Sequence, residues 1–271
     1  MKMNDMKRGN CLQNKIKQIS FLIFLIPLLL LVGCHSKKET IDLKSGYDLF
    51  LLVGQSNMAG RGVIEAEDTT EHNRVFMLNA ADEFVLAKEP LHFDKANRGT
   101  GPGLAFGKAM AEANPKIKIG LIPAAVGGTK ISYWEPGTSR GLYEEAIRKA
   151  KVAMKYGTLK GIVWQQGESD SNTKDAPLYK ERLLKLLTAF RKDLGNNNLP
   201  IVIGGLGDFL KSSQYNVVNK ALQEVADEIG NARFSEASTL GHIGDRLHFN
   251  SKAQRENGNN MAKAMLKLKH H

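Results

Sequence analysis

A serine near the start of the sequence stands where nucleophilic chemistry is possible. Ser56 lies in residues 54–60 (GQSNMAG), directly after an apolar run that predicts a buried strand. A hydroxyl in the turn that follows such a strand is well placed to attack a ligand. The hydrolase elbow G-x-S-x-G is not matched, because Met58 stands where its second glycine would be. Ser56 is therefore either a nucleophile or a turn or helix-capping serine, and a base is needed to decide.

A candidate base occurs near the end of the chain. His248 closes the sequence Asp245-Arg246-Leu247-His248, just before the last predicted helix. Three residues of separation in a loop let the carboxylate hold one imidazole nitrogen while the other faces outward. Alone, the pair could equally be a surface aspartate and a histidine beside a helix. With Ser56, it would form a Ser-His-Asp triad.

Polar residues and glycines follow other predicted strands. Residues 164–170 (WQQGESD) place two amides and a glycine directly after a buried strand, which is unfavourable for packing alone. The Gln166 amide could donate to a developing oxyanion or satisfy loop carbonyls. Glycines in residues 101–103 and 127–128 would let backbone N–H groups approach a ligand or would make tight turns. No spacing typical of metal ligands occurs, so no metal or organic cofactor is expected.

These residues depend for their positions on alternating strands and helices. From residue 47 onward, short runs rich in Val, Ile and Leu alternate with segments of helical period. Such near-continuous apolar strands are typical of a parallel sheet covered on both faces. The predicted strands are 47–53, 74–78, 117–122, 160–165 and 199–204, with a weaker one at 232–235. The predicted helices are 102–113, 142–155, 177–194, 215–229 and 251–266.

One α/β domain explains this pattern: a three-layer α/β/α sandwich around a five-stranded parallel sheet. Gly195 and Gly230 would end two helices, and Ser251 with Gln254 would form a capping box for the last one. Ligands bind such sheets at the carboxyl ends of the strands. The loop that carries Ser56 is among those expected there.

The composition is that of a globular protein. The chain has 271 residues, 42% of them hydrophobic, with 38 Lys and Arg against 28 Asp and Glu. This excludes a disordered, collagenous or disulfide-rich chain. Part of the net charge of +10 is carried by residues 1–33, where five basic residues accompany one aspartate. The remaining charges are mixed in sign, so nucleic-acid binding is not expected.

The first residues indicate export. A basic stretch up to Lys17 precedes the apolar run 21–32, which contains Pro27 and is shorter than the roughly 20 residues that span a bilayer. The run ends at Gly33-Cys34, which resembles a bacterial lipoprotein cleavage box. We therefore expect a signal peptide over 1–33, a lipidated Cys34 with a tether over 34–46, and a domain over 47–271 anchored in the bacterial cell envelope. The alternative is an uncleaved N-terminal anchor with Cys34 as an idle thiol.

Four blocks of residues together resemble one enzyme family. They are residues 54–58, 101–103, 164–170 and 245–248, with residues 127–129 and Trp134 between them. In this order they look like the sialate O-acetylesterase and acetylxylan esterase branch of the SGNH (GDSL-type) hydrolases, also called carbohydrate esterase family six. The match covers about residues 47–266. It implies a flavodoxin-like sheet and a triad of Ser56, His248 and Asp245.

The resemblance also implies an oxyanion hole. Its donors would be the Ser56 N–H, a glycine N–H of the second block and the Gln166 side chain, which stands where the wider family has asparagine. For the glycine, Gly103 is favoured over Gly101. The other residues expected to bind substrate or to support the site are Gln55, Asn57, Gly128, Trp134, Glu168 and Asp170. Among these, Glu168 and Asp170 match the Q-G-E-x-D run of this branch and would support their loop.

The expected reaction is removal of O-acetyl groups from carbohydrates such as acetylated xylan or sialic acid. One alternative is a cell-surface carbohydrate-binding protein on the same fold without turnover. Another is a lipid esterase or lysophospholipase, which would need an apolar acyl pocket. The polar loops 63–73 and 131–140, the latter with Tyr133 and Trp134, favour sugars. The oligomeric state is left open.

Overall fold

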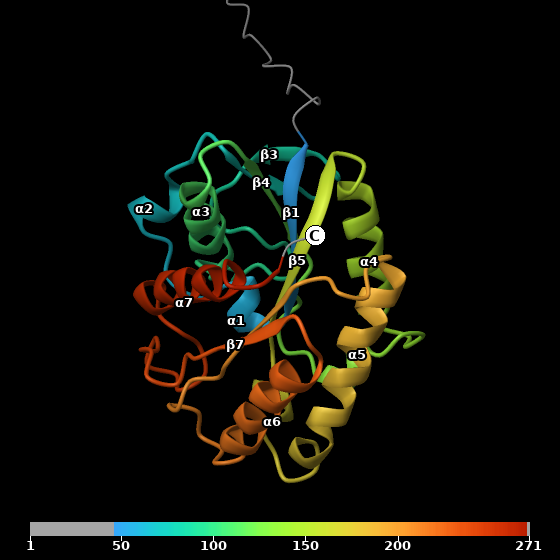
Figure 1. The fold of residues 1–271 in the computed structure, drawn as a ribbon. Helices are drawn as coiled ribbons and strands as arrows, with labels where there is room; N and C mark the ends of the chain where they lie inside the picture. Colours follow the sequence, from blue (N-terminus) through green and yellow to red (C-terminus); the bar gives the residue numbers. More distant parts are fainter. Residues whose placement is uncertain (1–45, 270–271) are drawn as a thin grey trace, which may run out of the picture. The chain divides into compact units, whose positions relative to one another are not determined.

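A computed structural model describes residues 46–269, and the expected signal peptide and Cys34 lie outside these residues. The strands are β1 (Tyr47–Gly54), β2 (Val75–Leu78), β3 (Phe84–Leu86), β4 (Lys118–Pro123), β5 (Gly157–Gln165), β6 (Ile201–Gly204) and β7 (Ala232–Ser235). They form one sheet in the order β3-β2-β4-β1-β5-β6-β7 (Figure 1). The pairs are parallel except for β2 with β3, which is antiparallel.

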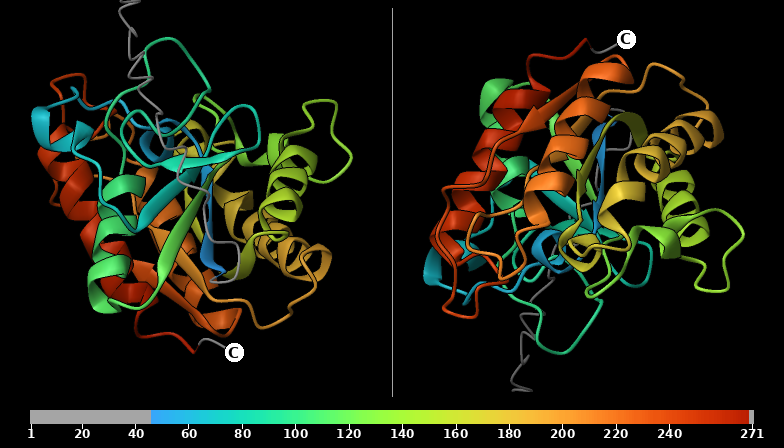
Figure 2. Two further views of the ribbon diagram at one scale, coloured as in Figure 1. Left: turned by 90° about the horizontal axis from the view of Figure 1, so that it is seen from above. Right: turned by 90° about the horizontal axis from the view of Figure 1, so that it is seen from below.

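Helices cover both faces of this sheet (Figure 2). They are α1 (Ser56–Ala59), α2 (Ala66–Thr69), α3 (Gly103–Ala113), α4 (Leu142–Ala153), α5 (Tyr179–Asp193), α6 (Tyr215–Glu228) and α7 (Ser251–Met265). Among residues 46–269, none of the helices combines the length and the apolar composition needed to cross a membrane.

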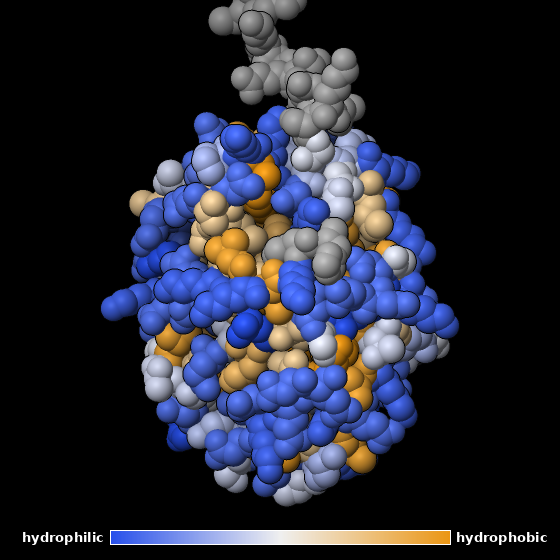
Figure 3. Space-filling model, in the orientation of Figure 1, coloured by the Kyte–Doolittle hydropathy of each residue, from blue (hydrophilic) through white to orange (hydrophobic). Residues whose placement is uncertain are grey.

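The alternation of β1 explains the three layers. Leu49 and Leu51 enter one apolar core with residues of α4, α5 and α6. Phe50 and Leu52 enter the other with residues of α3 and α7. Successive side chains of a strand point to opposite faces, so an uninterrupted apolar run must be covered twice. The predicted α/β/α sandwich is confirmed. The surface over α6 and α7 is mainly hydrophilic, with apolar residues in separate patches (Figure 3).

The sheet has two strands more than the five expected. One is β7, the weak candidate at 232–235, which extends the parallel sheet beside β6. The other is β3, a three-residue strand that pairs with β2 through a turn in which Asp82 has a φ of 61°. Both lie at edges and are only partly buried, with Phe84 and Arg233 among their accessible residues. β3 is only three residues long and β7 contains Arg233 and Ser235, so neither has the longer apolar run that marks a central strand.

The helix ends follow the sequence closely, with one correction. Gly195 and Gly230 follow α5 and α6 with φ values of 76° and 68°, in the left-handed region expected of such glycines. The expected capping box at the start of α7 is wrong. Asn250 is the capping residue, because its side chain accepts a hydrogen bond from the Ala253 N–H at 2.9 Å. Ser251 instead donates to the Val63 carbonyl.

Candidate active site

Ser56 begins α1 at the carboxyl end of the central strand β1, as Figure 1 shows. The turn before it requires glycine, because Gly54 has a φ of 137° and a Cβ there would lie 1.9 Å from the Gln165 carbonyl oxygen. The chain then turns so tightly that the N–H groups of Met58 and Ala59 both bond the Gln55 carbonyl. The Ser56 N–H has no hydrogen-bond partner within residues 46–269. It is thus free to donate to a ligand.

The structure brings Ser56, His248 and Asp245 into one hydrogen-bonded chain. His248 Nε2 lies 3.1 Å from Ser56 Oγ, and His248 Nδ1 lies 2.6 Å from Asp245 Oδ2. The second oxygen of Asp245 accepts the N–H groups of Leu247 and His248, both at 2.9 Å. Partial burial raises the pKa of Asp245, but the hydrogen bonds from His248 and Leu247 outweigh it and hold the pKa below its usual range. The carboxylate therefore stays ionised beside the imidazole.

This chain opens onto a polar cleft with a volume of about 410 Å³. Its lining residues are Gln55, Ser56, Arg61, Lys95, Asn97, Gly127, Gly128, Glu168, Ser169, Leu247 and His248. They come from the loops after β1, β4 and β5, from the segment between β3 and α3, and from the loop before α7. Loops after four parallel strands of the sheet, β1, β4, β5 and β7, thus meet around Ser56, and eight of the eleven lining residues carry polar side chains.

The loop after β4 supplies a backbone donor at the cleft. Gly127 donates its N–H to Asp94 Oδ2 at 2.8 Å, and Arg61 Nη2 donates to the same oxygen at 2.6 Å. The next residue, Gly128, has a φ of 75°, and its N–H has no partner in the described part of the chain. Arg61 and Asp94 form a buried ion pair that holds this loop, and no sequence motif had indicated either of them.

Gly103 does not lie at the cleft, so its expected oxyanion role is wrong. It begins α3, and a Cβ on it would lie 2.7 Å from side-chain carbons of Leu52 and Leu91. Its surroundings are therefore the apolar core. Gly101 lines a different groove. Gly128 lines the cleft, and its N–H has no partner within residues 46–269; the sequence predicted for it only substrate binding or support of the site.

The structure also contradicts an oxyanion role for Gln166. The side chain is fully buried, and its Nε2 lies 3.0 Å from Gln55 Oε1, 3.0 Å from the Thr129 carbonyl and 2.6 Å from Asp170 Oδ2. Its Oε1 accepts the Tyr179 hydroxyl at 2.8 Å. An amide nitrogen has two hydrogens, and these three buried acceptors within bonding distance share them, so none is left for an oxyanion. The alternative that it ties down the loop is the one that the geometry supports.

Gln166→Ala is accordingly expected to destabilise the whole domain. It would leave the Asp170 carboxylate and the Tyr179 hydroxyl buried without this partner, which costs about 2–4 kcal/mol in free energy of unfolding. The free energy of unfolding, measured by chemical denaturation, and kcat should therefore both fall. Gln223→Ala, at an exposed position of α6, is the control. It should change neither the free energy of unfolding nor kcat. A selective loss of kcat with unchanged stability would restore the oxyanion role.

Trp134 is an interior residue and offers no platform to a sugar. It is fully buried, its indole N–H donates to Thr129 Oγ1 at 3.1 Å, and its ring packs edge-on against Trp164 at 5.6 Å. The Asp170 carboxylate accepts the N–H of Ile131, a residue of the same loop after β4, at 2.9 Å. These contacts support the loop after β4 from behind, and Trp134 does not line the cleft.

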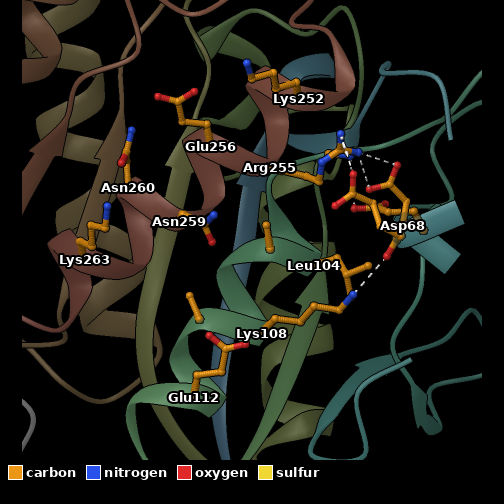
Figure 4. A pocket seen from close by; sticks show the side chains of 15 residues that line it. Asp68, Leu104, Lys108, Glu112, Lys252, Arg255, Glu256, Asn259, Asn260 and Lys263 are labelled. Carbon is orange, nitrogen blue, oxygen red and sulfur yellow. Dashed lines mark hydrogen bonds and ion pairs between the residues drawn. The ribbon is translucent and has the colours of Figure 1, made fainter. Parts of the chain in front are cut away.

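A second groove runs between α3 and α7 (Figure 4). Arg255 of α7 bonds both carboxylate oxygens of Asp68 at 3.0 Å, and it also pairs with Glu65 and Glu67. Lys108 of α3 donates to the Glu67 carbonyl. None of the triad residues lines this groove. The hydrogen-bonded Ser56 and His248 line the other cleft, together with Gly128.

Comparison with known proteins identifies the family of the chain. The family model described as carbohydrate esterase, sialic acid-specific acetylesterase, matches residues 46–267. A probable carbohydrate esterase of Arabidopsis thaliana is 31% identical over 245 residues, which make up 80% of this chain and 90% of that protein.

Solved structures share the fold. A crystal structure from Arabidopsis thaliana has a TM-score of 0.75 at 32% identity and covers 82% of this chain and 98% of its own. A carbohydrate acetylesterase from Xanthomonas citri has a TM-score of 0.63 at 19% identity, over 82% of this chain and 56% of its own. Because the family model spans nearly all the described residues, the chain belongs to the sialic acid-specific acetylesterase family of carbohydrate esterases and is a carboxylic ester hydrolase.

Proposed function

We propose that this protein removes O-acetyl groups from carbohydrates through an acyl-serine intermediate, with Ser56 as nucleophile, His248 as base and Asp245 as the group that orients it. The observation that carries the proposal is the continuous hydrogen-bonded chain from Ser56 Oγ through the imidazole to Asp245, with distances of 3.1 and 2.6 Å. It ends in an open polar cleft, where an acetylated sugar can reach the hydroxyl.

The first half of the reaction forms the acyl-serine. Ser56 Oγ attacks the acetyl carbonyl carbon while its proton passes to His248 Nε2. Asp245 holds the Nδ1 proton and stabilises the imidazolium. The N–H groups of Ser56 and Gly128 are the donors we assign to the tetrahedral oxyanion, because each lines the cleft and lacks a partner within residues 46–269. Collapse breaks the bond to the sugar oxygen, which takes the proton from His248.

The second half releases acetate. A water molecule gives a proton to His248 Nε2 and attacks the acyl carbon, and the same donors receive the second oxyanion. Ser56 Oγ then leaves and regains its proton from the imidazolium. The products are acetic acid, which ionises to acetate and a solvent proton, the deacetylated sugar and free enzyme; His248 carries the protons exchanged with Ser56, the sugar oxygen and the attacking water.

The lining of the cleft favours a sugar over a fatty acyl chain. Arg61, Lys95, Asn97 and Ser169 supply charged or hydrogen-bonding groups, and Leu247 is the aliphatic side chain among the lining residues. A long acyl chain would need a continuous apolar wall. Acetylated xylan, O-acetylated sialic acid or a similar glycan fits this chemistry.

The test is an ester panel. The purified protein should hydrolyse 4-nitrophenyl acetate with a kcat/KM at least tenfold above that for the butyrate, and it should release acetate from acetylated xylan or O-acetylated sialic acid. Preference for longer acyl chains would indicate a lipid esterase. Glycan binding without acetate release would indicate the non-catalytic alternative.

We also propose that the enzyme is anchored in the bacterial cell envelope by acyl chains on Cys34. The support is the basic stretch, the short apolar run and Gly33-Cys34 in sequence. Cys34→Ser is expected to move the protein from the detergent phase to the aqueous phase in Triton X-114 partitioning, because the anchor is lost. Cys11→Ser is the matched control, since Cys11 would be removed with the signal peptide. Absence of fatty-acid labelling in the wild type would contradict the anchor.

A further inference from the structure

The residue after the nucleophile contacts the backbone on both sides of the catalytic histidine. Asn57 Nδ2 donates to the Leu247 carbonyl at 3.0 Å, and Asn57 Oδ1 accepts the Phe249 N–H at 3.1 Å. These two groups flank His248 directly. The side-chain amide of Asn57 therefore pairs with the 247–249 segment much as a neighbouring strand would.

Glu168 fixes the orientation of that amide. The second hydrogen of Asn57 Nδ2 is donated to Glu168 Oε1, so both N–H bonds and the oxygen of the amide are used. A carboxylate can only accept, which means that the nitrogen must face Glu168 and Leu247. A reversed amide would place Asn57 Oδ1 against two acceptors and its nitrogen against the Phe249 N–H. The arrangement thus has one satisfied orientation.

We propose that Asn57 and Glu168 are positioning residues that hold the imidazole of His248 at hydrogen-bond distance from Ser56. Ser56 and Asn57 are adjacent on α1, so the turn that carries the Ser56 hydroxyl also carries the side chain that hydrogen-bonds the backbone on either side of His248. Asp245 controls the rotation of the imidazole, and Asn57 controls where its backbone lies. This inference rests on the proposed function, since it concerns the same triad.

The other hydrogen bonds of the loop before α7 do not connect His248 to α1. Ile243 donates to the His248 carbonyl at 3.0 Å, and Arg246 Nε donates to the Phe209 carbonyl at 3.1 Å. Both tie the loop to itself or to the segment after β6. The Asn57 contacts tie it to the element that carries Ser56. Displacing a reacting group by about 1 Å can lower a rate roughly a hundredfold.

The first test is the rate at which an alkyl fluorophosphonate inactivates the enzyme. Ser56 Oγ forms a bond to phosphorus, fluoride leaves and His248 takes the serine proton, so the rate reports the nucleophile and base without carbohydrate recognition. Asn57→Ala should lower this rate, and the kcat for 4-nitrophenyl acetate, roughly a hundredfold with little change in KM. Asn57→Ala with the wild-type inactivation rate would overturn the inference. An unreactive wild type would overturn the proposed function as well.

Variants of Glu168 test the second member and cover the case in which Asn57→Ala fails to fold. Glu168→Gln keeps an acceptor for Asn57 and should lower kcat less than Glu168→Ala does. The double variant Asn57→Ala/Glu168→Ala should be no slower than Asn57→Ala, because Glu168 acts through Asn57. Equal kcat for Glu168→Gln and Glu168→Ala, or additive losses in the double variant, would overturn the pairing.

Stability separates positioning from a merely structural role. Burial raises the pKa of Glu168 to about 6, the hydrogen bond from Asn57 opposes this, and the Asp170 charge adds to it. The other titratable or charged side chains at the cleft belong to Arg61, Lys95 and His248. A raised carboxyl pKa means that stability is lost as pH rises through about 6. Glu168→Gln should therefore raise Tm at pH 8 while lowering kcat, whereas a structural role predicts that both fall.

Asn250→Ala is the matched control. Asn250 lies two residues after His248 and also bonds the backbone, but it caps α7 and does not line the cleft. Its loss should lower Tm and leave the inactivation rate within about twofold of the wild type. A rate loss as large as that of Asn57→Ala would show that any loosening of this loop has the same effect, and would overturn the specific role of Asn57.

Discussion

Ser56→Ala is expected to abolish the turnover of acetyl esters and to leave the fold intact. Without the hydroxyl no acyl-serine forms, and such losses in serine hydrolases amount to roughly 10⁴-fold or more in kcat. The turn itself depends on Gly54 and on the Gln55 carbonyl rather than on the hydroxyl. Tm should therefore stay within a few degrees of the wild type. Initial rates with 4-nitrophenyl acetate and a thermal melt measure both quantities.

Ser171 supplies a matched control for that experiment. It is a buried serine, like Ser56, and its hydroxyl donates to the Gly167 carbonyl at 2.9 Å, but it does not line the cleft. Ser171→Ala should keep its turnover. Near wild-type activity of Ser56→Ala would mean that the nucleophile lies elsewhere and would remove the central proposal.

Asp245→Asn is expected to lower kcat about 10³- to 10⁴-fold at neutral pH. The asparagine oxygen can still accept the N–H groups of Leu247 and His248, so the loop keeps its shape. Its amide nitrogen would then face His248 Nδ1 and donate to it. The imidazole proton must move to Nε2, where it blocks acceptance of the Ser56 proton.

The pH dependence of stability provides an independent reading of Asp245. The pKa of Asp245 is lower in the folded protein than in the unfolded chain. The ionised carboxylate therefore stabilises the fold at pH values above its unfolded pKa, and this stabilisation is lost as pH falls through its folded pKa. The Tm of Asp245→Asn should therefore fall less on acidification than the Tm of the wild type. Asp208→Asn, at an exposed residue of the loop after β6, should leave kcat unchanged. A kcat within tenfold of the wild type for Asp245→Asn would show that another group orients the imidazole.

Local sequence signals were sufficient to propose the three residues that the structure brings into one hydrogen-bonded chain. Ser56 follows a strand that an apolar run marks, and Asp245 and His248 are three residues apart in one loop, so the geometry of that pair depends on nearby backbone alone. The carboxyl ends of parallel strands meet at one edge of a sheet, and the pattern of strands therefore predicted where Ser56 would lie. The central strands and the long helices were predictable from local pattern as well. A strand buried on both faces is a continuous apolar run, and a helix packed on a sheet has apolar residues at the helical period.

The roles of amides and glycines were decided by partners distant in sequence. Gln166 and Gln55 are 111 positions apart, and Asn57 and Leu247 are 190 apart. An amide can donate to a ligand or to the interior, and the choice depends on which groups the fold brings opposite it.

The same limit applies to the oxyanion donor. Gly103 and Gly128 are equally permissive glycines, but β4 lies next to β1 in the sheet, and this order puts Gly128 rather than Gly103 beside Ser56. The sequence by itself predicted the proposed triad and determined the layers that carry it, because both depend on local pattern. The tertiary structure decided which neighbours orient and assist those groups, because hydrogen bonds across loops depend on strand order and packing rather than on residue type.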